Sequence, residues 1–247
     1  MVKCLRRIHR ILYLLLVLFF FLLCYPFLFF FTKNPTKYYN QIVFCRKWIS
    51  VLATYAVGIR FDISYDEDID WSKGYVICPN HTSILDITAL TYLCPQPFSF
   101  IGKVELLQNP VTRTFFKSID ITVDRASRIS AYKAFKQADQ RLKEHKSLVI
   151  FPEGKIDDEY PPQLHAFKAG SFRLAVDNKI PILPIVILDA WKILWDGGEK
   201  YGSRPGKIHI KVLKPIPTAD LTQVEAEELQ NKVFATMQDC WLRYNKN

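Results

Sequence analysis

His81 lies five residues before Asp86, and no other histidine of the 247-residue chain has a carboxylate at that spacing. A histidine with an ordinary pKa can take a proton from a hydroxyl group at neutral pH. A carboxylate that accepts from the far ring nitrogen fixes the tautomer and stabilises the imidazolium that forms. No serine or cysteine stands at a fixed place beside this base and its acid, so the attacking hydroxyl could belong to the substrate.

The residues around His81 predict an exposed position for it. The apolar run over residues 75–78 is typical of a short buried strand, and Thr82 or Ser83 could cap a helix over residues 84–93. His81 would then lie at the carboxyl end of a strand, where open α/β sheets bind their ligands. In the alternative interpretation, the segment is only a helix cap beside a solvated loop histidine.

A second segment, Phe151 to Gly154, favours the functional interpretation. Residues 148–151 form another apolar run, which Pro152 ends at once, so that Glu153 is placed at a strand end. With average residue usage, a given string of four residues occurs by chance in roughly one chain per thousand of this length. Coincidence is therefore a poor explanation for both segments in one chain.

Together these segments resemble the sequence blocks of the glycerolipid acyltransferases, the family typified by 1-acyl-glycerol-3-phosphate acyltransferase. The Asn-His-x4-Asp block matches completely in Asn80 to Asp86, and Phe151 to Gly154 is similar to the third block. Other segments similar to the family, in its order, are Gly102 to Leu106, Val123 to Arg125, Phe167 to Gly170 and Ile180 to Ile185. The resemblance covers about residues 74–188 and is specific for the family but weak for the individual substrate.

Two positions depart from the family pattern. The third block usually continues with threonine or serine and then arginine, where this chain has Lys155, Ile156 and Asp157. The second block usually has a glycine six residues before its arginine, where this chain has Ile119. Lys155 could replace part of the missing charge, but without the bidentate fork of arginine. These departures leave the acceptor lipid open.

The resemblance implies acyl transfer from a thioester to the free hydroxyl of a lysophospholipid, most simply 1-acyl-glycerol-3-phosphate, which gives phosphatidic acid. His81 would deprotonate the hydroxyl, and Asp86 would orient the imidazole. Backbone N–H groups near Asn80 or Gly154 could stabilise the tetrahedral oxyanion, a contribution often worth about 3 kcal/mol. The alternatives are another acceptor such as a lyso-amino-lipid, a membrane thioesterase or hydrolase, and a non-catalytic lipid-binding protein. A hydrolase would more typically show a Gly-x-Ser-x-Gly motif, which this sequence lacks.

Several residues are expected to hold the substrates. The resemblance implies that Arg125 binds the acceptor's phosphate, whereas Lys103 and Lys168 could be further ligands or ordinary surface lysines. Glu153 would either bond an acceptor hydroxyl or structure its turn. The full predicted substrate-binding set is Asn80, Lys103, Arg125, Phe151, Pro152, Glu153, Gly154 and Lys168.

The net charge of +9 is concentrated in the first 60 residues. That segment carries nine of the 33 basic side chains and no acidic ones, which leaves 24 basic against all 24 acidic side chains in the remainder. A nucleic-acid binder would be expected to carry its positive charge on the folded domain. Basic residues within an apolar segment instead suit anionic lipid, so we predict a membrane-surface partner and no nucleic acid.

The N-terminal segment is apolar enough to enter a membrane. Residues 11–31 form an uncharged run rich in Leu and Phe, which as a helix would be about 31 Å long, close to the hydrocarbon thickness. Pro26 should kink or break this helix. A second apolar stretch, residues 42–59, is interrupted by Arg46 and Lys47, which suits a helix in the membrane interface. The basic flanks fit a single-span anchor or a re-entrant hairpin, with the active site facing the cytoplasm.

The sequence gives no reason to invoke a metal or an organic cofactor. Its six cysteines lack Cys-x-x-Cys spacing and predict free thiols in a reducing compartment. It has no zinc motif and no Gly-rich phosphate loop. We therefore expect no cofactor, with acyl-CoA or acyl carrier protein serving as a co-substrate.

After residue 61 the chain alternates short apolar runs with amphipathic segments, which predicts an α/β domain around a largely parallel or mixed sheet flanked by helices. We assign residues 1–60 to membrane-anchoring helices and residues 61–247 to the acyltransferase catalytic domain. Strands are predicted over 75–78, 98–101, 121–123, 148–151, 183–188 and 209–213, and helices over 84–93, 130–143, 170–178 and 222–244. Trp191 and Trp195 could line an acyl groove or form one packed helix face.

Overall fold

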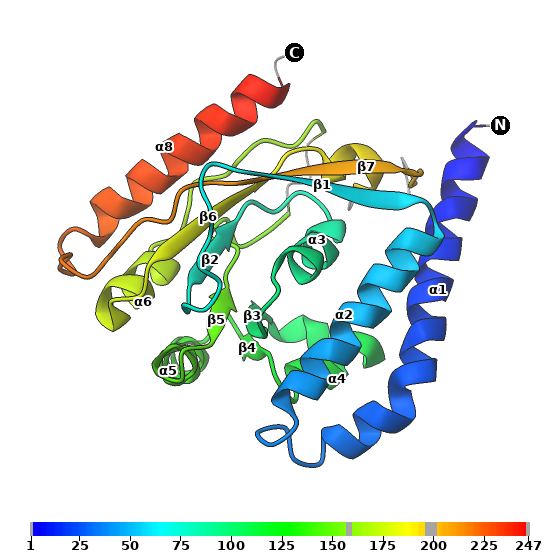
Figure 1. Cartoon of the computed structure of the whole chain (residues 1–247), viewed down its shortest axis with the longest axis horizontal. Helices are drawn as coiled ribbons and strands as arrows, with labels where there is room; N and C mark the ends of the chain where they lie inside the picture. Colours follow the sequence, from blue (N-terminus) through cyan, green and yellow to red (C-terminus); the bar gives the residue numbers. More distant parts are fainter. Residues whose placement is uncertain (1, 157–159, 196–201, 246–247) are drawn as a thin grey trace.

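The apolar runs form seven β-strands that join one sheet in the part of the chain described here (Figure 1). The computed structural model describes residues 2–156, 160–195 and 202–245. The strands are β1 (Ile59–Tyr65), β2 (Val76–Pro79), β3 (Phe98–Lys103), β4 (Ile121–Val123), β5 (Ser147–Val149), β6 (Ile182–Ile187) and β7 (Gly206–Val212). Their order is β1-β7-β6-β2-β5-β3-β4, and every neighbouring pair is parallel except β6 with β7. The predicted mixed α/β sheet is confirmed.

Helices cover both faces of this sheet, which explains why the central strands are almost entirely apolar. The α-helices of the described residues are α1 (Val2–Phe31), α2 (Tyr39–Ala56), α3 (Leu85–Leu93), α4 (Pro110–Phe116), α5 (Arg128–Lys143), α6 (Gly170–Asn178), α7 (Ala190–Ile193) and α8 (Ala226–Asn245). Helices α5, α6 and α8 pack on one face, and α2 and α3 pack on the other, with α1 alongside α2 (Figure 1). Strands β2, β5 and β6 are buried along their whole length.

Every predicted strand and helix after residue 61 is present within a few residues of its expected bounds, but β1 and the short helices α4 and α7 were not predicted. In β1, Ile59, Phe61 and Ile63 alternate with polar residues, as expected for a strand at the edge of a sheet. The predicted division between residues 60 and 61 falls inside this strand and stays a prediction. Helix α8 begins four residues late, because Thr222 instead donates to the Glu225 carboxylate in the preceding turn.

Helix α1 is continuous through Pro26 as far as Phe31, so the predicted break does not occur. Its ribbon bends towards the C-terminal end (Figure 1). The buried residues of α1 are Tyr13, Phe21 and Leu28, and they form one narrow stripe along the helix. Most of the Leu and Phe side chains of α1 are exposed. Among the described residues, α1 is the one helix that is long and apolar enough to cross a membrane.

The sequence suggested that Arg46 of α2 lies in a membrane interface. In the structure, its side chain is instead buried against the sheet. Its guanidinium donates to Asp120 Oδ1 at 2.6 Å and to the Phe98 carbonyl at 2.8 Å. Its Cζ also lies 4.6 Å from the Phe98 ring centroid and 4.8 Å from that of Phe100. Asp120, just before β4, accepts a further hydrogen bond from the Phe100 N–H at 2.8 Å. This buried ion pair fastens α2 to β3 and β4.

We expect Asp120→Ala to lower the free energy of unfolding by about 3–5 kcal/mol, because it leaves the Arg46 guanidinium buried without its counter-charge. The matched control is Asp239→Ala on α8, which breaks an ion pair with Arg243 whose side chains are 65% and 75% exposed. That change should cost less than about 1 kcal/mol. Denaturant unfolding in detergent micelles, followed by circular dichroism, measures both. Equal losses in the two variants would contradict the role of the buried pair.

Candidate active site

The His81 imidazole and the Asp86 carboxylate are in direct contact. His81 lies in the turn between β2 and α3, and Asp86 is the second residue of α3. Nδ1 of His81 is 2.9 Å from Oδ2 of Asp86. Asp86 is fully buried, whereas 17% of the His81 side chain is exposed. Because Nδ1 faces a carboxylate, it carries the proton of the neutral ring, and Nε2 is left as a proton acceptor.

The Asp86 carboxylate also shapes the turn that carries His81. The same Oδ2 accepts from the N–H of Thr82 at 2.7 Å and from the N–H of Ser83 at 2.8 Å. Of the two predicted caps, Thr82 makes no side-chain hydrogen bond among the described residues, whereas the Ser83 hydroxyl binds the first residue of α3. Ser83 accepts one hydrogen bond from the N–H of Leu85, and its hydroxyl donates to the Leu194 carbonyl.

Two buried polar side chains brace this turn against the neighbouring strands. Asn80 accepts from the Ile187 N–H at 2.7 Å and donates to the Ile187 carbonyl at 3.1 Å. Glu153 accepts from the backbone N–H of His81 at 2.7 Å and from that of His165 at 2.8 Å, one on each carboxylate oxygen. Asn80 thus has a structural role, and its predicted substrate contact stays a prediction. Glu153 structures the turn, the second of its two predicted roles.

Phe151 fixes the plane of the imidazole. Its ring stacks on His81 with centroids 3.9 Å apart and an interplanar angle of 22°. Phe100 lies parallel to Phe151 on a second layer, at 6.5 Å and 3°. Phe151 therefore contacts the candidate base itself.

Two cationic side chains converge on Gly154, directly after Glu153. Gly154 has φ +75°, and Arg125 donates to its carbonyl. A Cβ placed on Gly154 would lie 3.0 Å from Lys168 Nζ and 3.4 Å from Arg125 Nη1. The Lys168 N–H bonds the Pro152 carbonyl at 2.9 Å, which holds this lysine beside the turn. Neither cation makes a salt bridge within the described residues.

Two further cations, Lys103 and Lys155, lie near Arg125 and Gly154, Lys103 through strand register and Lys155 in the sequence. Lys103 is the exposed last residue of β3 and pairs in register with Val123, two residues before Arg125. It therefore lies at the same end of the sheet. Lys155 is exposed directly after Gly154, and Asp157 lies outside the described residues.

Sequence reasoning missed a second histidine–aspartate contact, because its members are 20 residues apart. Nδ1 of His209 lies 2.7 Å from Asp189 Oδ2, and the Tyr244 hydroxyl donates to the same carboxylate at 2.8 Å. The opposite nitrogen, Nε2, lies 3.9 Å from Asp62 Oδ2. A cavity of about 630 Å³ opens beside this cluster. Carboxylates on both sides of His209 would repel an oxyanion or a phosphate, so we favour the His81 pair as the reaction centre.

The backbone N–H groups of Asn80 and Gly154 themselves are engaged. That of Asn80 donates to the Ile185 carbonyl at 3.4 Å, and that of Gly154 donates to the Phe151 carbonyl at 3.1 Å. The expectation that N–H groups near these two residues stabilise the oxyanion stays a prediction. The side chains of Trp191 and Trp195 are both buried in the core that includes α8. Trp195 lies beyond the end of α7, so the two do not form one helix face as predicted.

The sequence and the fold of the chain match known proteins. A profile of the Acyltransferase family matches residues 60–188, just over half of the chain. An uncharacterized acyltransferase of Schizosaccharomyces pombe is 33% identical over 75% of this chain and 67% of its own length. Human 1-acyl-sn-glycerol-3-phosphate acyltransferase beta is 28% identical over 81% of this chain and 71% of its own length. The chain therefore belongs to the acyltransferase family, as the sequence resemblance indicated.

A solved structure extends this likeness to the whole fold. The 1-acyl-sn-glycerophosphate (LPA) acyltransferase PlsC from Thermotoga maritima aligns with a TM-score of 0.75 over 98% of both chains, at 22% sequence identity. The alignment includes the N-terminal helices as well as the sheet, because it leaves almost no part of the chain uncovered. The two proteins therefore share one architecture.

Cys78 is the cysteine nearest to His81 in the sequence, and its burial makes the thiol unreactive. Burial raises the pKa of Cys78 to about 12, and it also raises that of Cys94 to about 12. We expect iodoacetamide at pH 8 to label exposed Cys4 in the folded protein and to leave Cys78 and Cys94 unlabelled, since the thiolate is the reactive species. Mass spectrometry after labelling, with a denatured control in which all cysteines react, measures this. Labelling of Cys78 as fast as Cys4 would contradict it.

Proposed function

We propose that this acyltransferase moves a fatty acyl group from an acyl thioester to the free hydroxyl of 1-acyl-glycerol-3-phosphate, forming phosphatidic acid. The observation that carries the proposal is the His81–Asp86 contact, braced by Glu153 and followed at Gly154 by two cations, Arg125 and Lys168, for which the described residues provide no carboxylate partner. A poised base suits a hydroxyl, and the cations suit a phosphate. The similarity to the human 1-acyl-sn-glycerol-3-phosphate acyltransferase beta supports the same acceptor.

The proposed reaction needs only one proton relay. His81 Nε2 takes the proton of the acceptor hydroxyl while the hydroxyl oxygen attacks the thioester carbonyl. Asp86 accepts from Nδ1–H and stabilises the imidazolium that forms. The tetrahedral intermediate collapses with cleavage of the C–S bond, and the imidazolium returns its proton to the departing thiolate. Diacyl lipid and free thiol leave, and His81 regains its starting state.

Arg125 and Lys168 form the proposed phosphate site, with Lys103 and Lys155 adding positive charge around it. One nitrogen of the Arg125 guanidinium is held by the Gly154 carbonyl, which leaves further N–H donors for phosphate oxygens. A lyso-amino-lipid would bring an ammonium group towards these cations, and like charges repel. The charges therefore favour an acceptor with a bare phosphate over the lyso-amino-lipid alternative.

The exposed apolar surface of α1 and α2 supports attachment to a membrane. Phe44, Trp48 and Leu52, four residues apart, are exposed on α2 and continue the apolar surface of α1. Helix α1 is about 45 Å long and contacts the catalytic domain near both ends. Arg6 bonds Ser203 at one end, and Phe21 and Leu28 pack with α4 towards the other.

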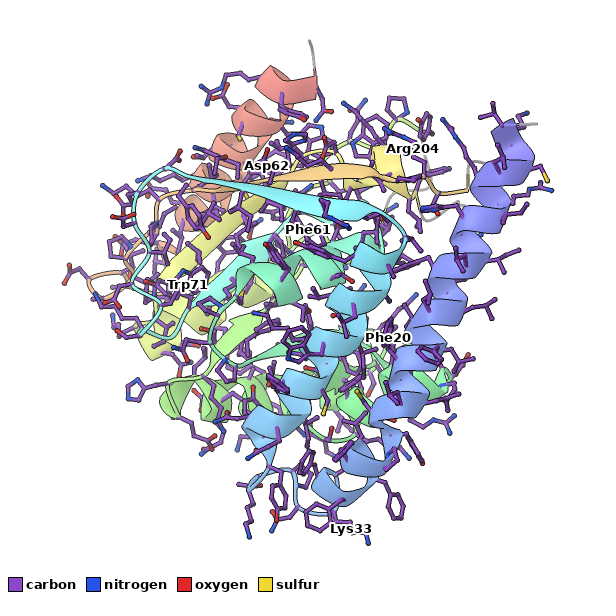
Figure 2. The ribbon with its side chains drawn as sticks, turned by 45° about the vertical axis from the view of Figure 1, so that its right-hand side comes forward. Phe20, Lys33, Phe61, Asp62, Trp71 and Arg204 are labelled. Atoms are coloured by element: carbon purple, nitrogen blue, oxygen red, sulfur yellow. The ribbon has the colours of Figure 1, made fainter. Side chains whose placement is uncertain are left out.

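This docking favours a helix pair that lies in one leaflet over a helix that spans the bilayer. A spanning α1 would carry the flank of the catalytic domain into the hydrocarbon, because the helix is attached to it over most of its length. Figure 2 shows Lys33 in the turn at one end of the pair and Arg204 near the opposite end of α1. Basic residues at both ends of the helix suit the anionic lipid of the cytoplasmic leaflet. The active site would then face the cytoplasm. There it would use acyl-CoA or acyl carrier protein as the donor. The proposed steps involve no metal or organic cofactor.

We expect His81→Ala to lower kcat by at least about 10³-fold, because the variant loses the base that activates the hydroxyl. The matched control is His209→Ala, which removes the other histidine in contact with an aspartate and should keep most of the activity. Product formation from acyl-CoA and 1-acyl-glycerol-3-phosphate, followed by mass spectrometry, measures both. Normal turnover in the His81 variant would refute the assignment, and free fatty acid as the sole product of the wild type would identify a hydrolase.

We expect Arg125→Ala and Lys168→Ala each to raise the KM for 1-acyl-glycerol-3-phosphate by about 10- to 100-fold, the usual effect of losing a hydrogen bond to a charged group. The KM for the acyl donor should stay unchanged. Lys143→Ala, which removes an exposed lysine of α5 paired with Asp139, is the control. Steady-state kinetics with lysophosphatidic acid and a zwitterionic lyso-lipid in parallel tests the acceptor. A preference for the zwitterionic lyso-lipid would overturn the proposal that 1-acyl-glycerol-3-phosphate is the acceptor.

A further inference from the structure

Helix α1 touches the segments that carry the candidate catalytic pair. We propose that His9 on α1 is a positioning residue, which holds the Asp86 turn in its active geometry through Ser203 and Leu194. This inference rests on the proposed function and gives α1 a role beyond membrane attachment. The helix that contacts lipid would then also be a structural part of the active site.

The first link joins α1 to the segment before β7. The half-buried His9 ring has Nε2 2.9 Å from the Val57 carbonyl and Nδ1 2.5 Å from the Ser203 hydroxyl. A carbonyl can only accept, so Nε2 carries the proton, and Nδ1 of the neutral ring accepts from Ser203. Ser203 itself is buried. His9 therefore bridges the end of α2 and a buried serine, using both nitrogens.

The backbone of the same segment lies against α1. The Ser203 N–H donates to the Arg6 carbonyl at 3.0 Å. Gly202 has φ +66°, and a Cβ at this position would lie 2.6 Å from the carbonyl carbon and oxygen of Arg6. Only glycine permits both this backbone conformation and this close approach. The segment therefore fits α1 at the turn that carries Arg6 and His9.

The second link runs from this segment to the catalytic pair. Ser203 forms an antiparallel bridge with Leu194, just after α7. The Leu194 carbonyl accepts from the Ser83 hydroxyl, and the Ser83 N–H donates to Asp86 Oδ2 at 2.8 Å. Asp86 Oδ2 in turn contacts His81. Hydrogen bonds and this one backbone bridge, beside which the Arg204 N–H donates to the Ile193 carbonyl at 3.1 Å, thus connect His9 on α1 with the candidate base.

Tyr13, one turn further along α1, provides an independent attachment. Its side chain is buried, and its hydroxyl interacts with Thr88 of α3 and Thr54 of α2. Because α3 also carries Asp86, α1 is fastened to both sides of the Asp86 turn. A shift of α1 would move the Leu194 carbonyl, which accepts from the Ser83 hydroxyl. Through Ser83 it would also move the Asp86 carboxylate, which orients His81. Such a shift should lower the rate of chemistry rather than substrate binding, because it touches no proposed substrate contact.

We expect His9→Ala to lower kcat by about tenfold, since a small misplacement of a catalytic group is enough for such a loss. The KM for both substrates and the binding to anionic phospholipid vesicles should stay within about twofold, because no apolar surface or phosphate ligand changes. His9→Gln should recover most of the rate, because its amide can donate to Val57 and accept from Ser203. Ser203→Ala should reproduce the loss, and the double variant should show no further loss.

Cys4→Ala is the control, because Cys4 is exposed on the same helix. The assays use the full-length protein with acyl-CoA and 1-acyl-glycerol-3-phosphate in mixed micelles, and vesicle sedimentation is measured separately. An unchanged kcat in His9→Ala, a loss that follows vesicle binding, or additive effects in the double variant would overturn the positioning role. Absence of diacyl product from the wild type would instead overturn the proposed function, so the two failures are distinguishable.

Discussion

One oxygen of the Asp86 carboxylate holds the candidate site together. Oδ2 accepts from the N–H groups of Thr82 and Ser83 and contacts the His81 imidazole, all at 2.7–2.9 Å. A carboxylate that is fully removed from water would be costly without such donors, so its burial and these contacts depend on each other. The atom that folds the turn is also the atom that orients the base. The turn cannot change its shape without moving the imidazole, and the remainder of the structure serves to keep it in place.

The sheet supplies that support because β2 lies between β5 and β6. In parallel strands the carboxyl ends meet at one edge, which brings Glu153, after β5, to the backbone of His81, 72 residues earlier. On the other side, Asn80 bonds Ile187 at the end of β6. Both braces use buried polar side chains that bind backbone groups of neighbouring segments. The cations of the proposed phosphate site lie further along the same edge, after β4 and β5.

The sequence predicted the His81–Asp86 contact and much of the fold, because both motifs follow short apolar runs that form buried strands. It revealed less where the partner of a residue lies far away in the chain. Arg46 appeared interfacial because nothing local reveals Asp120, 74 residues later. The structural role of Asn80 was not visible either, because its bond to Ile187 exists only in the assembled sheet. Strand β1 was missed for a different reason. Its alternation of apolar and polar residues is visible in the sequence, but it directly follows the longer apolar stretch of residues 42–59.

The attachment of α1 needs a separate physical explanation if its outer face rests in lipid. Within a bilayer, an apolar helix gains little by leaving lipid for an apolar protein surface, so close packing and hydrogen bonds must hold it. Two polar side chains that α1 turns towards the protein, His9 and Tyr13, would be costly there unless they were paired. Both are paired, His9 with Ser203 and Val57, and Tyr13 with Thr54 and Thr88. Hydrogen bonds are directional, so they fix the rotation and the register of the helix as well as its contact. A helix docked in this way has one position relative to α3, which is the condition under which a lipid-facing element can also position Asp86.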